Sequence, residues 1–243
     1  MSTRSPLGLA RRIEAGLRRL GDPIRAEGAK RYLRSELEFI GVPTPPFRRL
    51  IKGELRALPD LQREELLAGV ERLWGSEVFE LRAAAVELLD LRGDLLEGRD
   101  IVLVERLIRG SGTWALVDNL AARVAGSLVE RSPRLARTLD RWAGDGDFWV
   151  RRSAMLALLI PLRRGAGDWE RFARYADAML EEKEFFIRKA IGWVAREVAK
   201  KRPALVAAWL EPRAHRASGV TLREALKYLP PEARRRISRA SGR

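Results

Sequence analysis

The 243-residue sequence has no cysteine and only one histidine, His215. The lack of cysteine excludes disulfides and cysteine-ligated zinc or iron–sulfur sites. A single histidine excludes His-rich metal centres, so composition leaves open only a carboxylate site for magnesium or calcium. Charges interrupt every apolar stretch, and no run of 18 uncharged apolar residues exists that could span a membrane or, near residue 1, serve as a signal peptide. These absences predict a cytoplasmic protein.

Standard catalytic motifs are missing as well. The sequence has no Walker loop, no dinucleotide-binding glycine fingerprint after a strand and no HExxH pair. A serine or cysteine triad is excluded because His215 is isolated near the C-terminus, where we expect it in a loop. Any catalysis must therefore depend on a carboxylate and on electrostatics.

Positive charge is in excess and unevenly distributed. The chain has 47 Lys and Arg against 33 Asp and Glu, a net charge of +14, and residues 141–243 carry 23 basic and 12 acidic side chains, net +11. Such a bias predicts a polyanionic partner such as nucleic acid, because Lys and Arg that neutralise phosphates release counterions. The alternative is an Arg-rich genome, which would also explain 40 Arg against 7 Lys.

Composition and turn signals predict an all-α protein. Leu and Ala number 68, whereas the β-branched residues Val, Ile and Thr number 29. Asp22 before Pro23 predicts a helix that starts at residue 23, and Gly-Asp or Gly-Ser steps recur at 75–76, 93–94, 110–111 and 144–145. We expect about a dozen helices, with residues 43–46, Pro-Thr-Pro-Pro, as the loop that makes the sharpest break.

Four segments form a repeat: SEVFELRAAAVELL, SGTWALVDNLAARV, DFWVRRSAMLALL and EFFIRKAIGWVARE. Aligning them places Phe79, Trp114, Trp149 and Phe186 at intervals of 35, 35 and 37 residues. This is the range of TPR and HEAT helical pairs, which stack into solenoids with a long concave binding face. An irregular helical bundle with chance spacing is the alternative.

Asp118 is the residue that departs most from the repeat. Four residues after the aromatic, the segments carry Ala83, Asp118, Ser153 and Ala190, so only one repeat has a carboxylate there. A helical projection of residues 113–128 places Asp118 on a stripe beside the apolar face, together with Trp114, Ala121 and Ala125. The stripe predicts the floor of a groove; alternatively, Asp118 pairs with an arginine and Trp114 fills the core between repeats.

A second helix carries a tryptophan among cations. Its edge opposite the apolar side contains Lys189, Trp193, Arg196 and Lys200. A flat ring flanked by cations suits a sugar or base with neighbouring phosphates, and a surface cation–π pair is the alternative. Arg152 shares a stripe with apolar residues and therefore needs a partner, either Asp118 or a phosphate. Tyr32 lies at the border of an apolar line.

These residues resemble the DNA alkylation repair proteins of the AlkD type, which are HEAT-like-repeat DNA glycosylases. The similarity covers nearly the whole chain, through TWALVDNL, FWVRRSAMLALL and EFFIRKAIGWVAREVAKK, the last of which is close to a family signature. The resemblance implies one domain over residues 1–243, a right-handed α-solenoid with a concave DNA-binding face. It further implies that Asp118 is the catalytic aspartate and that Trp114 and Trp193 lie beside the sugar of the lesion. Arg152 then contacts DNA, and Tyr32 lines the same cleft.

The implied activity is monofunctional hydrolysis of the N-glycosidic bond of N3- or N7-alkylated purines in duplex DNA, without base flipping. We also expect DNA contacts from Arg151, Lys189, Arg196 and Lys200. No cofactor, metal, membrane or obligate protein partner is expected, and the protein is expected to be a monomer. Two alternatives stay open: a non-catalytic protein that recognises branched or distorted DNA, and a protein-binding scaffold.

Overall fold

The computed structural model describes residues 6–242 of the chain. The regular elements in this range are all helical, and β structure is limited to an isolated parallel bridge between Glu38 and Val78. The all-α prediction is therefore confirmed. Among the same residues, no helix is both long enough and apolar enough to cross a lipid bilayer.

The chain divides into two compact units, Met1–Leu120 and Ala121–Arg243. The first unit contains α1 (Pro6–Arg19), α2 (Pro23–Leu33), α3 (Thr44–Arg56), α4 (Arg63–Trp74), α5 (Phe79–Leu91), α6 (Ile101–Arg109) and α7 (Trp114–Asn119). The second contains α8 (Gly126–Arg131), α9 (Ala136–Ala143), α10 (Phe148–Leu156), α11 (Leu159–Arg163), α12 (Trp169–Met179), α13 (Phe185–Ala199), α14 (Pro203–Leu210), α15 (Gly219–Ala225) and α16 (Pro231–Ala240). One domain with a concave face remains a prediction.

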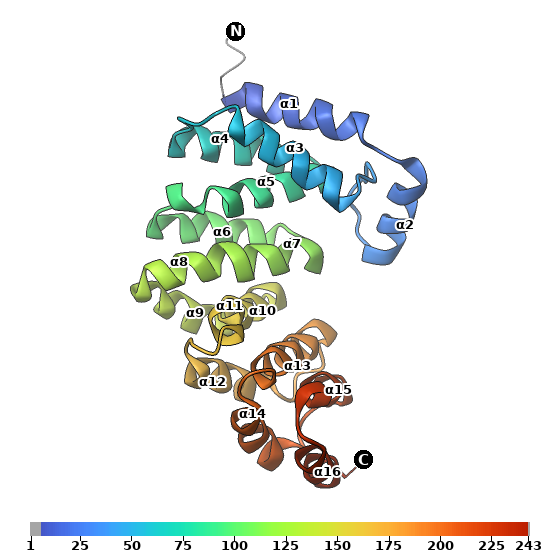
Figure 1. The fold of residues 1–243 in the computed structure, drawn as a ribbon, viewed down its shortest axis with the longest axis vertical. Helices are drawn as coiled ribbons and strands as arrows, with labels where there is room; N and C mark the ends of the chain where they lie inside the picture. Colours follow the sequence, from blue (N-terminus) through green and yellow to red (C-terminus); the bar gives the residue numbers. More distant parts are fainter. Residues whose placement is uncertain (1–5, 243) are drawn as a thin grey trace. The chain divides into compact units, whose positions relative to one another are not determined.

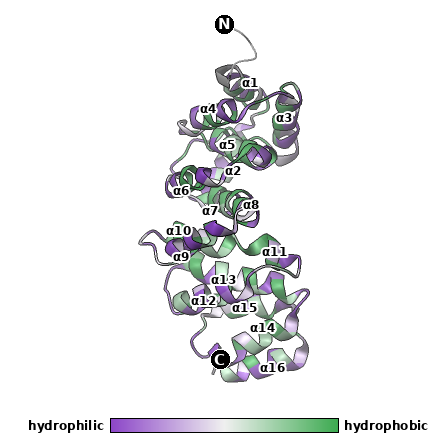
Figure 2. Ribbon diagram, turned by 90° about the vertical axis from the view of Figure 1, so that its left-hand side faces the viewer, coloured by the Kyte–Doolittle hydropathy of each residue, from purple (hydrophilic) through white to green (hydrophobic). Residues whose placement is uncertain are grey.

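Helices pack within each unit as a repeat of helical pairs requires. In the first unit α4 packs against α1 and α5, and α5 in turn contacts α7 (Figure 1). In the second unit α10 packs against α9 and α13, and α13 packs along α15 (Figure 1). Most helices carry hydrophobic residues on one side and hydrophilic residues on the other (Figure 2), and packing buries the apolar side. Helix α2 is an exception, because none of its residues is buried.

The repeat is present, but its predicted register is wrong by one residue in two places. Phe79 and Trp114 are the first residues of α5 and α7, whereas Trp149 and Phe186 are the second residues of α10 and α13. The side chains of Asp147 and Glu184 cap these two helices and determine where they begin. Both helices start with two consecutive aromatic residues, which made the alignment on aromatics ambiguous.

Three of the four repeat helices share one hydrogen bond, which an arginine at the fourth helical position donates. In α5, α10 and α13 it donates a hydrogen bond to the carbonyl of the residue six positions earlier: Arg82 to Ser76 at 2.7 Å, Arg151 to Asp145 at 2.7 Å and Arg188 to Glu182 at 2.6 Å. The guanidinium thus fastens each helix to the turn before it. In this corrected register the fifth positions are Ala83, Asp118, Arg152 and Lys189, and Asp118 remains the one carboxylate.

Two further predictions about helix boundaries have different outcomes. Asp22 caps α2 as expected, since its Oδ1 accepts hydrogen bonds from the backbone N–H groups of Ile24 and Arg25. The prediction of a loop at residues 43–46 is wrong for Thr44 onward, because α3 starts at Thr44. Prolines fit there because the first turn of a helix does not need its N–H groups.

Candidate active site

Asp118 and Trp114 lie one turn apart on the short helix α7. Thr113 precedes the helix in an extended conformation, and its hydroxyl faces the backbone N–H of Ala115 at 3.5 Å. Leu116 and Val117 point into the core, while Trp114 and Asp118 are each half-buried. A carboxylate and an indole therefore share one partly accessible edge of α7, as the projection predicted.

Tyr32 of α2 extends this edge within the first unit. Its ring meets the ring of Trp114 edge-on, with centroids 6.0 Å apart and planes at 84°. Tyr32 is 74% exposed, so the pair presents aromatic surface to the outside rather than filling the core. The structure therefore places Tyr32 and Trp114 in direct contact. Asp118, the third predicted site residue of this unit, lies one turn after Trp114 on α7.

Glu80 holds the segment that positions α2. Its buried carboxylate accepts hydrogen bonds from three successive backbone N–H groups, those of Ile40 at 2.8 Å, Gly41 at 2.6 Å and Val42 at 3.3 Å. Gly41 has φ +83°, and a Cβ there would lie 2.1 Å from the carbonyl oxygen of Asp22. Only glycine permits this close approach, and sequence reasoning did not identify the role of Glu80.

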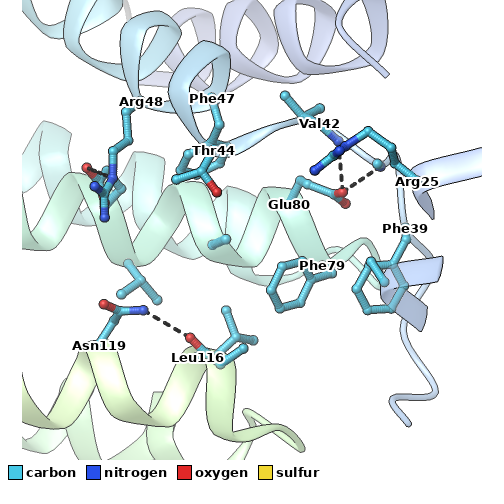
Figure 3. Close-up of a pocket in the computed structure, with 16 residues that line it drawn as sticks. Arg25, Phe39, Val42, Thr44, Phe47, Arg48, Phe79, Glu80, Leu116 and Asn119 are labelled. Atoms are coloured by element: carbon cyan, nitrogen blue, oxygen red, sulfur yellow. Dashed lines mark hydrogen bonds and ion pairs between the residues drawn. The ribbon is translucent and has the colours of Figure 1, made fainter. Parts of the chain in front are cut away.

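A pocket of about 290 Å³ lies next to this segment, between α2, α3, α5 and α7 (Figure 3). Glu80 and the stacked rings of Phe39 and Phe79 form one side, with ring centroids 4.9 Å apart. Ala115 and Asn119 of α7 form another side, whereas Trp114 and Asp118 do not line the pocket. The pocket therefore adjoins the candidate site without containing its carboxylate.

The predicted groove floor beyond Asp118 is not confirmed. Residues Leu120–Ala125 form a π-helical turn, in which hydrogen bonds run from i to i+5. A projection at the α-helical angle therefore fails after Asn119. Ala121 and Ala125, which were expected to continue the stripe, are completely buried.

Arg152 is buried in the second unit against aromatic rings. It is 2% exposed, its Nη1 donates a hydrogen bond to the carbonyl of Phe186, and its guanidinium lies 5.8 Å from the ring centre of Phe186 and 6.0 Å from that of Trp193. The prediction that this arginine needs a partner is confirmed. These partners are a carbonyl and two π-faces. Pairing of Arg152 with Asp118 or with a phosphate stays a prediction.

Trp193 does lie among cations, but these cations are paired with buried carboxylates. Lys189 contacts Glu224 at 2.6 Å, and Arg196 also binds the Glu224 carboxylate. Lys200 donates to both oxygens of Glu197, at 2.9 and 3.0 Å. Burial alone would raise the pKa of each glutamate, yet the surrounding cations hold both pKa values below the ordinary value.

Charge in this cluster remains positive after pairing. Its members are the carboxylates Glu197 and Glu224 and the cations Arg163, Lys189, Arg196, Lys200 and Lys227. Two negative charges therefore face five positive ones. The half-buried ring of Trp193 lies on the same helix as Lys189 and Arg196, and Lys200 follows at the C-cap of that helix. The two glutamates hold the long cationic side chains in fixed positions, which lowers the entropy lost when an anion binds.

Arg151 is held by several hydrogen bonds within the second unit. It binds the Glu182 carboxylate through two hydrogen bonds, at 3.0 and 2.8 Å, and its Nη1 donates to the carbonyls of Asp145 and Gly146. These bonds occupy most of the guanidinium donors. Arg151 therefore links α10 to the turn before it and to Glu182. A DNA contact by Arg151 stays a prediction.

Both units match a known protein family. A family model described as DNA alkylation repair enzyme matches residues 13–229. The chain belongs to this family. The match includes the helices that carry Trp114, Asp118, Arg152 and Trp193.

Three solved structures have a similar fold. A predicted DNA alkylation repair enzyme from Enterococcus faecalis superposes with a TM-score of 0.78 at 24% identity, covering 87% of this chain and 97% of its own. AlkD2 from Streptococcus mutans gives 0.60 at 17% identity, covering 75% and 90%. The protein smu.31 from Streptococcus mutans UA159 gives 0.58 at 17% identity, covering 76% and 98%. No curated protein matches the sequence.

Metal-binding groups are not found in the described part of this family member. Among residues 6–242 no three His, Cys, Asp or Glu side chains lie close enough together to hold a metal ion. His215 lies exposed in a turn after the 3-10 helix Glu211–Arg213, as predicted. The first unit offers a carboxylate and an aromatic ring at Asp118 and Trp114, and the second offers an aromatic ring among cations at Trp193.

Proposed function

We propose that this protein is a DNA glycosylase that hydrolyses the N-glycosidic bond of cationic N3- or N7-alkylated purines in duplex DNA. Family membership supports a DNA repair role. The observation that carries the finer proposal is the half-buried carboxylate of Asp118 one helical turn from Trp114, whose ring Tyr32 supports edge-on. This arrangement offers a negative charge and a π-face at one accessible edge.

Hydrolysis of an alkylated nucleotide requires few groups beyond this carboxylate and this aromatic ring. An alkylated purine is already cationic and leaves as a neutral base, so it needs no general acid, and one carboxylate suffices where glycosidases usually need two. Asp118 then stabilises the positive charge that develops on the sugar and positions the attacking water. The face of Trp114 adds cation–π stabilisation of the same charge.

The second unit supplies groups suited to the sugar and the phosphates. Trp193 presents a half-buried ring between Lys189 and Arg196, and Arg152 lies against that ring. The family resemblance implies that Trp193 and Arg152 serve the same reaction as Asp118, without drawing the base into a pocket. It also implies a monofunctional enzyme, because no lysine occupies the catalytic positions to form a Schiff base.

Release of 7-methylguanine from methylated duplex DNA tests the proposal, with Asp118→Asn as the main variant. We expect the variant to bind duplex DNA like the wild type but to release base at least about 10²-fold more slowly, as for removal of a group that stabilises charge in the transition state. Asp94→Asn is the matched control, because Asp94 is an exposed carboxylate of the same unit that pairs with Arg92 at 3.3 Å. It should leave the rate unchanged.

Other outcomes identify the alternatives. Binding of DNA by both proteins without release of any base would replace the enzyme by a non-catalytic DNA-binding protein. Failure of the wild type to bind duplex DNA at moderate salt would favour a protein-binding scaffold instead.

A further inference from the structure

The C-terminal helix α16 (Pro231–Ala240) lies beyond the region that the family model matches, which ends at residue 229. Residues 230–243 contain five arginines and one acidic residue, Glu232, so this short segment carries +4 of the net charge of +14. This concentration of charge belongs neither to the edge of α7 that carries Asp118 nor to the cationic cluster on α13.

Two contacts fix the orientation of α16 in the second unit. Ala233 and Ile237, one turn apart, are buried and pack the helix against neighbouring elements, which include α14 (Figure 1). Arg236 donates from Nε to both carboxylate oxygens of Glu211, at 3.0 and 3.2 Å. The helix therefore has one inward edge, and its other residues face outward.

The outward face is a row of arginines. One exposed face of α16 is formed by Pro231, Arg234, Arg235, Ser238 and Arg239. All five residues are exposed, and within residues 6–242 no carboxylate forms an ion pair with the three arginines among them. On α13, by contrast, the cations form ion pairs with Glu197 and Glu224.

Arg234, Arg235 and Arg239 carry like charges on one face of a single helix, and an anionic partner offsets the repulsion between them. Arg234 and Arg239 are five residues apart, so their Cα atoms are separated by about 7.5 Å along the helix axis. That distance corresponds to roughly two nucleotides of one DNA strand, at about 3.4 Å each. The planar fork of each guanidinium also matches the oxygens of a phosphate.

We propose that α16 binds the phosphate backbone of duplex DNA through Arg234, Arg235 and Arg239. This binding lengthens the DNA footprint of the protein beyond its family region and reads no base sequence. The inference rests on the proposed function only in taking DNA as the partner, and it requires no glycosylase chemistry.

The test measures how the dissociation constant of an undamaged 30-base-pair duplex depends on salt, with full-length protein. In the variant Arg234→Gln/Arg235→Gln/Arg239→Gln, we expect the slope of log Kd against log salt to fall by roughly 0.9 for each phosphate that is no longer neutralised, up to about 2.7. The matched triple Lys variant keeps the charges and should keep the slope. A second control, Arg11→Gln/Arg19→Gln/Arg49→Gln, removes equal charge from exposed positions in α1 and α3 and should lower the slope by less than about 0.9.

The outcomes separate this inference from the proposed function. Base release measured with saturating protein should be the same for the wild type and the triple Gln variant. If the wild type releases no base but the slopes still differ as expected, the catalytic proposal fails and DNA binding by α16 stands. If the slopes are equal, DNA binding by α16 is wrong; vesicles with phosphatidylserine that retain the wild type but not the Gln variant would then identify a lipid surface as the partner.

Discussion

At the scale of single residues, the predicted site positions of the two units differ in the contacts that hold their side chains. Trp114 and Tyr32 contact each other, Arg152 is enclosed by two rings and a carbonyl, and Arg151 is tied to Glu182. The helical projections could predict that Asp118 shares an edge with Trp114, because both lie on one short helix. They could not predict Glu80 as a clamp, because its partners lie about 40 residues earlier and only the fold brings them together.

Glu224 provides a test of how carboxylates organise the cationic cluster. Replacing Glu224 by Gln leaves Lys189 and Arg196 without their shared negative partner. We expect unfolding stability at pH 7 to fall by roughly 1.5–3 kcal/mol, the range for a hydrogen bond to a charged group. Urea unfolding measures the change, and Glu211→Gln is the control, because its partly exposed pair with Arg236 should contribute less than about 1 kcal/mol.

The same variant has a predicted pH dependence. The folded state holds the pKa of Glu224 below its ordinary value of 4.5. The stabilisation is therefore complete above about pH 4.5 and is lost as the pH falls through the lower, folded-state value. Between pH 6 and pH 3 the wild type should lose more stability than Glu224→Gln. Equal losses would show that the Glu224 carboxylate is not the cause of the pH dependence.

At the scale of elements, spacing in the sequence predicted the helical pairs better than it predicted their boundaries. Aromatic residues near the starts of α5, α7, α10 and α13 reveal the repeat, but side-chain caps at Asp147 and Glu184 decide its register. The π-helical turn at Leu120–Ala125 has no signal in a periodicity that assumes an α-helix throughout. Similarly, proline at residues 45 and 46 marks a helix start as readily as a loop.

The packing of α13 on α15 depends on a glycine. A Cβ added at Gly192 would lie 2.7 Å from the Cβ of Glu224 and 2.8 Å from the carbonyl oxygen of Thr221. Gly192→Ala should therefore push the two helices apart and lower stability by roughly 1–3 kcal/mol. The denaturant concentration at the midpoint of unfolding measures this loss of stability.

The control for this prediction is a second helical glycine with no neighbour. Around Gly28 of α2 nothing lies within 4 Å of an added Cβ. Gly28→Ala should leave stability unchanged or raise it by about 0.5–1 kcal/mol, because alanine favours the helix and restricts the unfolded chain. A reduction of similar size in both variants would mean that helix packing is not the cause.

At the scale of the whole molecule, the net charge of +14 is divided between charges that the fold neutralises and charges that it leaves exposed. Arg151 is paired, and the α13 cluster is only partly compensated. On α16 the row of arginines faces outward without ion pairs among the described residues. Such a surface favours a polyanionic partner, and a DNA-binding protein uses it for every duplex irrespective of sequence.

This distribution predicts a steep salt dependence of duplex binding. If six phosphates are neutralised, affinity for undamaged duplex DNA should fall about 10³-fold between 50 and 200 mM salt. Fluorescence anisotropy of a labelled duplex measures the fall. Because phosphate contacts do not involve Asp118, the Asp118→Asn protein should show the same slope as the wild type. A weak slope in both proteins, with binding that survives high salt, would place affinity in apolar contacts and remove the electrostatic basis for assigning DNA as the partner.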